Sequence, residues 1–324
     1  MRHGRILMAG NLFGISNPKE LTTELEKFDY LADEGLSVAL FLALSLSRPI
    51  LLEGEAGVGK TEVARTIAAW LGVPLIRLQC YEGVDAQMAV YEWDYPRQLL
   101  HLRTLEVTQA DHSSGLDAEV VEGELYTERF LIRRPLLQAI DPGSLTKKDD
   151  GRVLPPVLLI DEVDRADDEF EAFLLEALSD YSITVPELGT FTAEVPPIVI
   201  ITSNRTRDVH DALKRRCLYH WVEHPSFERE VEIITRRAPE VERSLAIQVA
   251  AIADKMRQVG LYKPPGIAEV IDWARSLSLL GETKIDADSL KASLGAILKY
   301  REDQDKIRSL DITELVRGAV LKGV

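Results

Sequence analysis

The fold of this chain is decided by eight residues, Gly54-Glu55-Ala56-Gly57-Val58-Gly59-Lys60-Thr61. They fit the pattern G-x-x-x-x-G-K-[ST], follow a short apolar run at 49–53, and precede a long amphipathic stretch at 60–71. A strand, a glycine-rich loop and a helix in this order form a phosphate-binding loop. We therefore expect a nucleotide-binding loop, with a buried strand before it and a helix after it.

The residue types in this loop indicate what it binds. Glycines allow successive backbone N–H groups to turn toward phosphate oxygens, and the start of the following helix adds partial positive charge. Lys60 has the length to reach the β- and γ-phosphates, and Thr61 offers a hydroxyl to Mg²⁺. ATP with Mg²⁺ is the expected ligand.

A second motif lies about a hundred residues further along the chain. The apolar run 157–160 ends in Asp161 and Glu162, at the end of the strand where open α/β sheets bind ligands. We expect Asp161 to belong to the Mg²⁺ shell and Glu162 to polarise the attacking water. This pair predicts hydrolysis as well as binding.

Two further polar features follow in the sequence. The buried run 198–203 ends in Asn204, whose amide can hydrogen-bond both the attacking water and the γ-phosphate. Arg215 and Arg216 follow a predicted helix and precede the strand 218–222. Phosphoryl transfer benefits from an arginine that a neighbouring molecule supplies, although a surface arginine pair can also be merely solvated.

The order of the elements predicts the fold class. Apolar runs of strand length at 49–53, 74–78, 157–160 and 198–202 alternate with helical patterns, which is typical of a parallel, doubly wound α/β sheet with helices on both faces. The apolar spacing at 21–46 predicts a helical segment before the first strand. The fold expected is that of a P-loop NTPase.

The same pattern suggests how the domains are divided. Residues 1–224 should form the α/β core, which includes an insert near 82–150 and a hairpin at 188–189. Within the insert, the polar segment 109–123 has the composition of an exposed loop. Prolines and a glycine separate helical stretches in 225–324, where no strand pattern remains, so we expect a small all-helical C-terminal domain.

Composition narrows the class of partner. The net charge of −15 and pI near 5.0 disfavour nonspecific binding to nucleic acid or to an anionic membrane. No apolar run reaches the length of a membrane span, and no secretory signal is visible, so a cytoplasmic protein is expected. The distant cysteines Cys80 and Cys217 suggest neither a disulfide framework nor a zinc site.

Together the segments GEAGVGKT, LLIDEVDRAD, ITSNRTRD and ALKRRC resemble the nucleotide site of AAA+ ATPases, and specifically of their MoxR branch, over about residues 20–300. The segments LQCYEGVD and YEWDYPRQLL further resemble the MoxR-type ATPases associated with maturation of carbon monoxide dehydrogenase and related molybdenum hydroxylases. The resemblance implies an AAA+ fold, ATPase activity and a role as a chaperone.

The resemblance also implies roles and partners. Lys60 and Thr61 match the Walker A pair, Asp161 and Glu162 the Walker B pair, and Asn204 the sensor-1 position. The last arginine of ALKRRC matches a finger that acts on the neighbouring subunit; this is Arg216, with Arg215 as the alternative. A hexameric ring, a helical lid, a partner with a von Willebrand factor A domain and a metalloenzyme client are also implied.

One departure concerns the lid. The segment that usually carries a sensor-2 arginine runs from Lys263 to Glu269 and has no arginine before Arg275. Either Lys263 substitutes or the role is missing. Two alternatives to the chaperone are a nucleic-acid motor, which the acidic balance and the lack of an appended basic domain disfavour, and a small-molecule kinase with the same loop.

Overall fold

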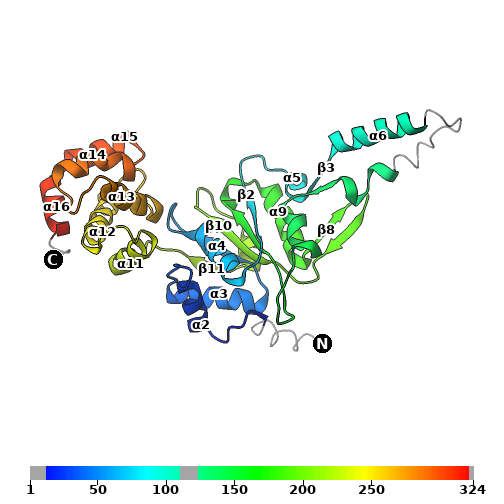
Figure 1. Cartoon of the computed structure of the whole chain (residues 1–324), viewed down its shortest axis with the longest axis horizontal. Helices are drawn as coiled ribbons and strands as arrows, with labels where there is room; N and C mark the ends of the chain where they lie inside the picture. Colours follow the sequence, from blue (N-terminus) through cyan, green and yellow to red (C-terminus); the bar gives the residue numbers. More distant parts are fainter. Residues whose placement is uncertain (1–11, 110–122, 321–324) are drawn as a thin grey trace. The chain divides into compact units, whose positions relative to one another are not determined.

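A five-stranded parallel sheet organises the first part of the computed structural model, which describes residues 12–109 and 123–320 (Figure 1). The strand order is β11-β1-β10-β7-β2. Strands β10, β7 and β2 are in parallel register, with Ile200 opposite Leu159 and Leu159 opposite Arg77. The strands are β1 (Ile50–Glu53), β2 (Leu75–Gln79), β7 (Val157–Asp161), β10 (Ile198–Ser203) and β11 (Leu218–Trp221). The predicted P-loop NTPase fold class is confirmed.

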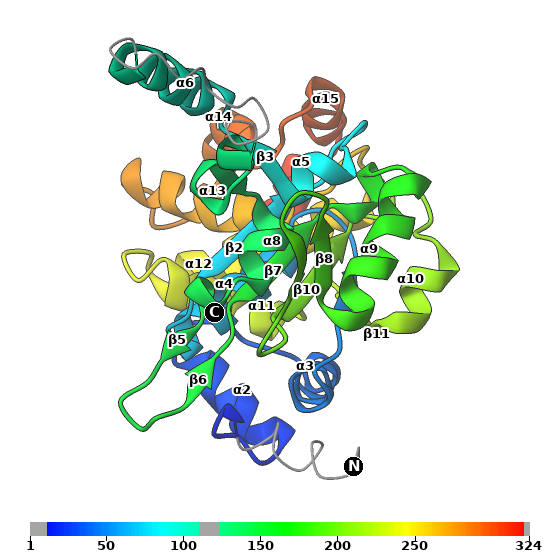
Figure 2. The same ribbon diagram turned by 90° about the vertical axis from the view of Figure 1, so that its right-hand side faces the viewer.

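One face of the sheet packs against helices α8 (Pro135–Ile140) and α9 (Asp168–Asp180), and Figure 2 shows α8 beside β2 and β7. Side chains alternate between the faces of a strand, and Leu51, Leu158 and Ile160 point into this core. There they share a cluster with Leu137 of α8 and Phe170 of α9, all buried. This apolar layer fixes the strand ends that carry polar residues.

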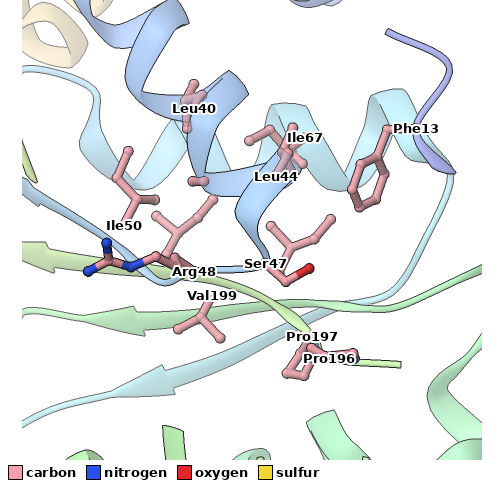
Figure 3. A pocket seen from close by; sticks show the side chains of 13 residues that line it. Phe13, Leu40, Leu44, Ser47, Arg48, Ile50, Ile67, Pro196, Pro197 and Val199 are labelled. Carbon is pink, nitrogen blue, oxygen red and sulfur yellow. The ribbon is translucent and has the colours of Figure 1, made fainter. Parts of the chain in front are cut away.

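The opposite face packs against α3 (Glu34–Leu46). In Figure 3 Ile50 of β1 lies on the same side as Leu40 and Leu44 of α3. A cavity of about 20 Å³ remains there, bounded also by Phe13 and Ile67. That volume is room for about one water, so we assign it to imperfect packing. Helices therefore cover both faces of the sheet, as predicted.

The segment before the sheet differs from the prediction of one helical stretch at 21–46. It forms two helices, α2 (Pro18–Glu26) and α3, with a turn between them. The first helix ends because Asp29 adopts a left-handed conformation with φ 57°, and the N–H of Tyr30 turns back to the carbonyl of Leu25. Apolar spacing alone does not reveal this stop, because no glycine or proline marks it.

The insert contains more regular structure than its sequence indicates. Two small antiparallel sheets, β3–β4 and β5–β6, join its helices, and buried Trp93 of β3 stacks edge-on against Tyr91 and Tyr126. Most of the predicted loop at 109–123 lies outside the described residues. The elements are α5 (Ala86–Val90), β3 (Tyr91–Trp93), α6 (Tyr95–Gln109), β4 (Leu131–Arg133), β5 (Thr146–Lys147) and β6 (Val153–Leu154).

The predicted hairpin near 188–189 is confirmed. It consists of β8 (Ser182–Val185) and β9 (Gly189–Thr192), paired antiparallel with Val185 opposite Gly189. It directly follows α9 in the chain, where Tyr181 ends the helix in a left-handed conformation with φ 48°. The short connection suits the two-stranded ribbon that the sequence indicates.

Beyond β11 the described chain is helical. Its core centres on fully buried Trp273, whose indole N–H donates a hydrogen bond of 2.8 Å to Ser293 Oγ. No described helix has the length and apolar character needed to cross a membrane. The helices are α10 (Asp211–Arg216) before the last strand, then α11 (Phe227–Arg237), α12 (Arg243–Gln258), α13 (Ile267–Leu279), α14 (Ala287–Ile297), α15 (Arg301–Ser309) and α16 (Ile312–Val320).

Contacts divide the chain into two units. The first contains the described residues up to Pro18 together with Val38–Leu52 and Ile67–His220. The second contains Lys19–Ser37 and Glu53–Thr66 together with the chain from Trp221 onward. The glycine-rich loop thus belongs to the same unit as the C-terminal helices. The boundary near residue 224 stays a prediction; the chain last enters the second unit at Trp221.

Candidate active site

The glycine-rich loop surrounds the lysine that ends it. Lys60 is the first residue of α4 (Lys60–Leu71) and is buried, and its Nζ donates hydrogen bonds to the carbonyls of Gly54 (2.8 Å) and Glu55 (2.6 Å). Gly59 just before it and Thr61 after it, on the first turn of the helix, are both half-buried. The ammonium charge is thus held within the loop.

Gly57 contacts the residues at the start of α13 (Ile267–Leu279). Its carbonyl accepts a hydrogen bond of 2.9 Å from the N–H of Ile267, the first residue of α13. A Cβ on Gly57 would lie 2.8 Å from Cα of Gly266, and one on Gly266 only 2.6 Å from Cα of Gly57. Gly57 also has φ +82°, so glycine is required there both sterically and conformationally.

The two ends of the loop are held within the same unit. The N–H of Val222 donates to Glu53 (2.7 Å), while the Val222 carbonyl lies so near Gly54 that a Cβ would approach it to 2.4 Å. His224 Nε2 lies 3.0 Å from the exposed carboxylate of Glu55.

Beyond the other end of the loop, Arg237 of α11 pairs with Glu62 of α4. Within the loop, Ala56 is exposed and Val58 is buried.

A buried ion pair fixes the segment that contacts Gly57. Arg257 of α12 donates to both carboxylate oxygens of Glu230 of α11, at 2.6 and 2.8 Å, and Glu230 is 1% exposed. The third guanidinium contact, from Nε, reaches the carbonyl of Pro265 at 3.0 Å. The bidentate pair therefore holds the residue next to Gly266 in place.

The segment before α13 is held at a second point, and it carries the possible sensor residues. Buried Asp303 accepts hydrogen bonds from the backbone N–H groups of Tyr262 (2.7 Å) and Lys263 (3.0 Å). The Lys263 side chain is exposed, and Arg275 pairs with Glu240 at 3.0 Å. The side chain of this segment that lies against the loop is instead Glu269.

On the sheet, Asp161 ends β7 with its carboxylate buried. Oδ1 accepts a hydrogen bond of 2.6 Å from the hydroxyl of Thr202 on β10. Oδ2 accepts two from Arg77 on β2, at 3.0 and 2.6 Å. Each contact crosses to an adjacent strand of the parallel sheet. A preorganised carboxylate of this kind suits a hard cation such as Mg²⁺.

Glu162 turns away from the strand in a left-handed conformation, with φ 56° and ψ 51°. Its N–H donates to the hydroxyl of Thr202 at 2.9 Å. Its carboxylate accepts from Asn204 Nδ2 (3.3 Å) and Gln79 Nε2 (3.2 Å), and lies 2.8 Å from Arg165 Nε. The structure thus brings Glu162 and Asn204 together, as an activator of water and its orienting amide require.

Asp164, which the motif analysis did not single out, fixes the backbone beside Asn204. It accepts hydrogen bonds from the N–H of Asn204 (3.1 Å) and from the N–H and hydroxyl of Thr206 (2.9 and 2.6 Å). Burial acts to raise the pKa of Asp164, but these hydrogen bonds outweigh burial and lower it. Asp164 is therefore a structural anion that orients the end of β10.

The two arginines of α10 differ in what they contact. Arg216 Nη1 donates a hydrogen bond of 2.5 Å to the carbonyl of Leu175 on α9. The side chain of Arg215 is exposed and makes no hydrogen bond or ion pair with the residues that the structure describes. Arg48 caps the carbonyls of both, with a contact of 2.9 Å to Arg216 O. Of the two arginines, Arg216 therefore has a described side-chain hydrogen bond and Arg215 does not.

Both cysteines are buried and have no described chemical role. Burial raises the pKa of Cys80 to about 12, and the neighbouring carboxylates, first Asp161, act in the same direction. Burial likewise raises the pKa of Cys217 to about 12. A raised pKa disfavours the thiolate, which is the reactive form of cysteine.

Sequence reasoning missed Thr202, Arg77 and Gln79. A signal existed for Arg77, because a cation inside an apolar strand usually has a buried anionic partner. No signal identified Thr202 or Gln79, because their partners lie 40 or more residues away and depend on strand register.

The residues present fit a magnesium nucleotide. The loop offers positive-φ glycines and a lysine for phosphates. Asp161 offers a buried carboxylate, and Glu162 offers a second carboxylate that accepts a hydrogen bond from the Asn204 amide.

The chain matches one known protein family. A family model described as "AAA domain (dynein-related subfamily)" matches residues 49–217, more than half of the chain. A search of curated proteins gives no match. Among solved structures, the chain is similar to the RuvB Holliday junction branch migration motor of Thermotoga maritima, with 16% identity, 88% of this chain and 72% of that chain covered, and a TM-score of 0.42. A mutant of that protein gives 17% identity, 84% and 68% coverage, and a TM-score of 0.44.

Proposed function

The chain belongs to the AAA domain family, dynein-related subfamily, and is an AAA+ ATPase; from this we propose that it uses Mg²⁺-dependent ATP hydrolysis to remodel a client protein. The observation that carries the proposal is the pairing of Glu162 with Asn204 next to the buried Asp161. A protein that only bound nucleotide would not need a carboxylate held in this way.

We assign roles to the chain's own residues. Lys60 binds the β- and γ-phosphates together with the loop N–H groups from Gly54 to Thr61. Thr61 and Asp161 hold Mg²⁺, which when bound neutralises charge that develops on the phosphates. Glu162 accepts the proton of the attacking water, and Asn204 orients that water and holds the glutamate.

We propose that the protein assembles into a ring in which a neighbouring subunit supplies an arginine to the site.

 The exposed and uncommitted Arg215 is the better candidate for this role, because Arg216 already donates to the carbonyl of Leu175. An arginine from outside stabilises the charge of phosphoryl transfer and makes hydrolysis depend on assembly. A hexamer is the ring size that we propose.

The client is proposed from the sequence resemblance alone. The segments LQCYEGVD and YEWDYPRQLL resemble the MoxR-type branch associated with molybdenum hydroxylase maturation. On that basis we propose a metalloenzyme client and a partner with a von Willebrand factor A domain. The net charge of −15 supports a protein partner over nucleic acid.

The test compares ATP turnover and ATP binding by wild type, Glu162→Gln and a matched control, Glu169→Gln. Glu169 is exposed on the first turn of α9, so its substitution makes the same charge change at a distance from the motif in sequence. We expect Glu162→Gln to bind ATP as wild type does and to lose at least about a hundredfold in turnover. Glu169→Gln should turn over ATP normally.

A size measurement with and without ATP tests the ring in the same samples. A hexamer-sized species in the presence of ATP supports the proposal. Full turnover by Glu162→Gln would contradict the assigned mechanism. Stimulation of turnover by DNA, with no response to a protein client, would replace the chaperone with a nucleic-acid motor.

A further inference from the structure

We propose that Glu269 is a further residue of the nucleotide site, and that its carboxylate opposes phosphate binding and so couples the phosphates to the docking of α13 on the loop. This inference rests on the proposed function, because it assumes that the glycine-rich loop binds the phosphates. It assigns to the C-terminal helices a repulsive residue where the family resemblance implies an attractive arginine.

The position of Glu269 supports the inference. A Cβ placed on Gly57 would lie 3.3 Å from Glu269 Oε2, so the carboxylate lies directly beside the middle of the loop. Oε2 is buried and accepts no hydrogen bond from the residues that the structure describes. A buried carboxylate oxygen without a donor is unfavourable, so the docked arrangement is held together by other contacts.

Those other contacts are specific. The N–H of Ile267 donates to Gly57 O at 2.9 Å, and Gly266 packs against Gly57 with no space for a Cβ on either residue. Arg257 holds the neighbouring carbonyl of Pro265. Glu269 also lies in the first turn of α13, where the helix N-terminus stabilises a negative charge.

Bound phosphates would add a repulsion between the loop and α13. The loop N–H groups and Lys60 attract anions, but a second anion a few ångströms from Gly57 repels the same phosphates. The repulsion weakens when α13 moves away from Gly57. Phosphate binding and the contact of Ile267 with Gly57 thus oppose each other, and the C-terminal helices respond to the number of phosphates bound.

The experiment measures binding of adenosine, ADP and adenosine 5′-(β,γ-imido)triphosphate, each with Mg²⁺, by isothermal titration calorimetry. The proteins are the full-length wild type, Glu269→Gln and a control, Glu302→Gln. Glu302 is exposed on α15 of the same unit, so its substitution matches the change in net charge. Glutamine keeps the shape of Glu269, removes its charge and replaces one carboxylate oxygen with an NH₂ donor.

We expect Glu269→Gln to bind the triphosphate analogue about tenfold more tightly than wild type does, as one nearby unit charge would give. The affinity for ADP should increase by a smaller factor, and adenosine should bind equally to both proteins. The gain should shrink as salt is raised. Glu302→Gln should bind all three as wild type does.

A second readout follows the contact itself. Hydrogen exchange at the N–H of Ile267 should become faster in wild type when the triphosphate analogue binds, because the bond to Gly57 O is released. The acceleration should be smaller in Glu269→Gln. Equal exchange in the two proteins, or no response in wild type, would overturn the coupling.

The outcomes separate this inference from the function on which it rests. If wild type binds none of the phosphate compounds, the proposed ATPase function of the loop fails. If wild type and Glu269→Gln bind the analogue equally, only the role of Glu269 fails. An equal gain for adenosine would show that Glu269 contacts the nucleoside and would overturn the repulsion.

Discussion

The hydroxyl of Thr202 donates a hydrogen bond of 2.6 Å to Oδ1 of Asp161. The same hydroxyl accepts the N–H of Glu162 at 2.9 Å, so one side chain of β10 positions both residues of the motif at the end of β7. Thr202 is buried, and its register is set by the parallel pairing of the two strands. It is a positioning residue for the proposed reaction.

Replacing Thr202 with valine should lower both stability and turnover. Valine has nearly the same shape but removes the acceptor of the Glu162 N–H and the hydroxyl that donates to Asp161 Oδ1. We expect a loss of about 1–3 kcal/mol in the free energy of unfolding, measured by urea denaturation. Thr202→Ser, which keeps the hydroxyl, should recover most of both losses, whereas equal losses in Val and Ser would assign the effect to packing.

The two arginines of α10 should respond differently to alanine. Arg216→Ala removes the hydrogen bond to Leu175 O and should lower the free energy of unfolding by about 0.5–1.5 kcal/mol. Arg215→Ala should leave stability within about 0.5 kcal/mol of wild type. In the assembled protein it should nevertheless lower ATP turnover by about a thousandfold with ATP binding retained.

Experiments that mix two variants check the predicted loss of turnover in Arg215→Ala. A mixture of Arg215→Ala and Glu162→Gln subunits should regain some turnover. In a mixed ring, an Arg215→Ala subunit keeps its own Glu162 and can receive Arg215 from a neighbouring Glu162→Gln subunit. Normal turnover by Arg215→Ala with loss in Arg216→Ala at unchanged stability would return the role to Arg216.

The buried pair of Arg257 and Glu230 should be sensitive to removal of one partner. Arg257→Met leaves Glu230, which is 1% exposed, charged and unpaired, and we expect a loss of about 3–5 kcal/mol in the free energy of unfolding. The double variant Arg257→Met/Glu230→Leu should recover most of this loss. It should still bind nucleotide abnormally, because the carbonyl of Pro265 has lost its donor.

Acid should weaken the end of β10 through Asp164. Its pKa is lowered in the folded protein, so its stabilising contribution is fully present above the ordinary value of 3.8 and is lost as pH falls through the lower folded pKa. Urea titrations between pH 5 and about pH 3 should show a smaller loss of stability in Asp164→Asn than in wild type. Parallel pH profiles would contradict this role.

Much of the fold could be predicted from the sequence because its signals are local. The strand before the loop and the helix at Lys60–Leu71 follow from an apolar run, the glycines after it and an amphipathic pattern, and the structure confirms them. The break between α2 and α3 could not be predicted, since it depends on the left-handed Asp29, which has no distinctive neighbour in the sequence.

The candidate site was predictable only where a motif fixes the spacing. Glu162 and Asn204 lie together as expected, because parallel strands end at one edge of a sheet. Which side chains hold Asp161 and Glu162 could not be predicted, because Thr202, Arg77 and Gln79 reach this pair only through strand register. The contact of Gly57 with Gly266 joins residues about two hundred positions apart and left no pattern in the sequence.

The left-handed backbone of Glu162 has a consequence for protein engineering. A non-glycine residue at φ 56° and ψ 51° is strained by about 1 kcal/mol, which glycine would relieve and asparagine would reduce. Selection for heat resistance alone should therefore favour replacing this glutamate and would yield a sturdier but inactive protein. Libraries built to stabilise this chain need a screen for turnover, or they will discard the residue that we propose activates the attacking water.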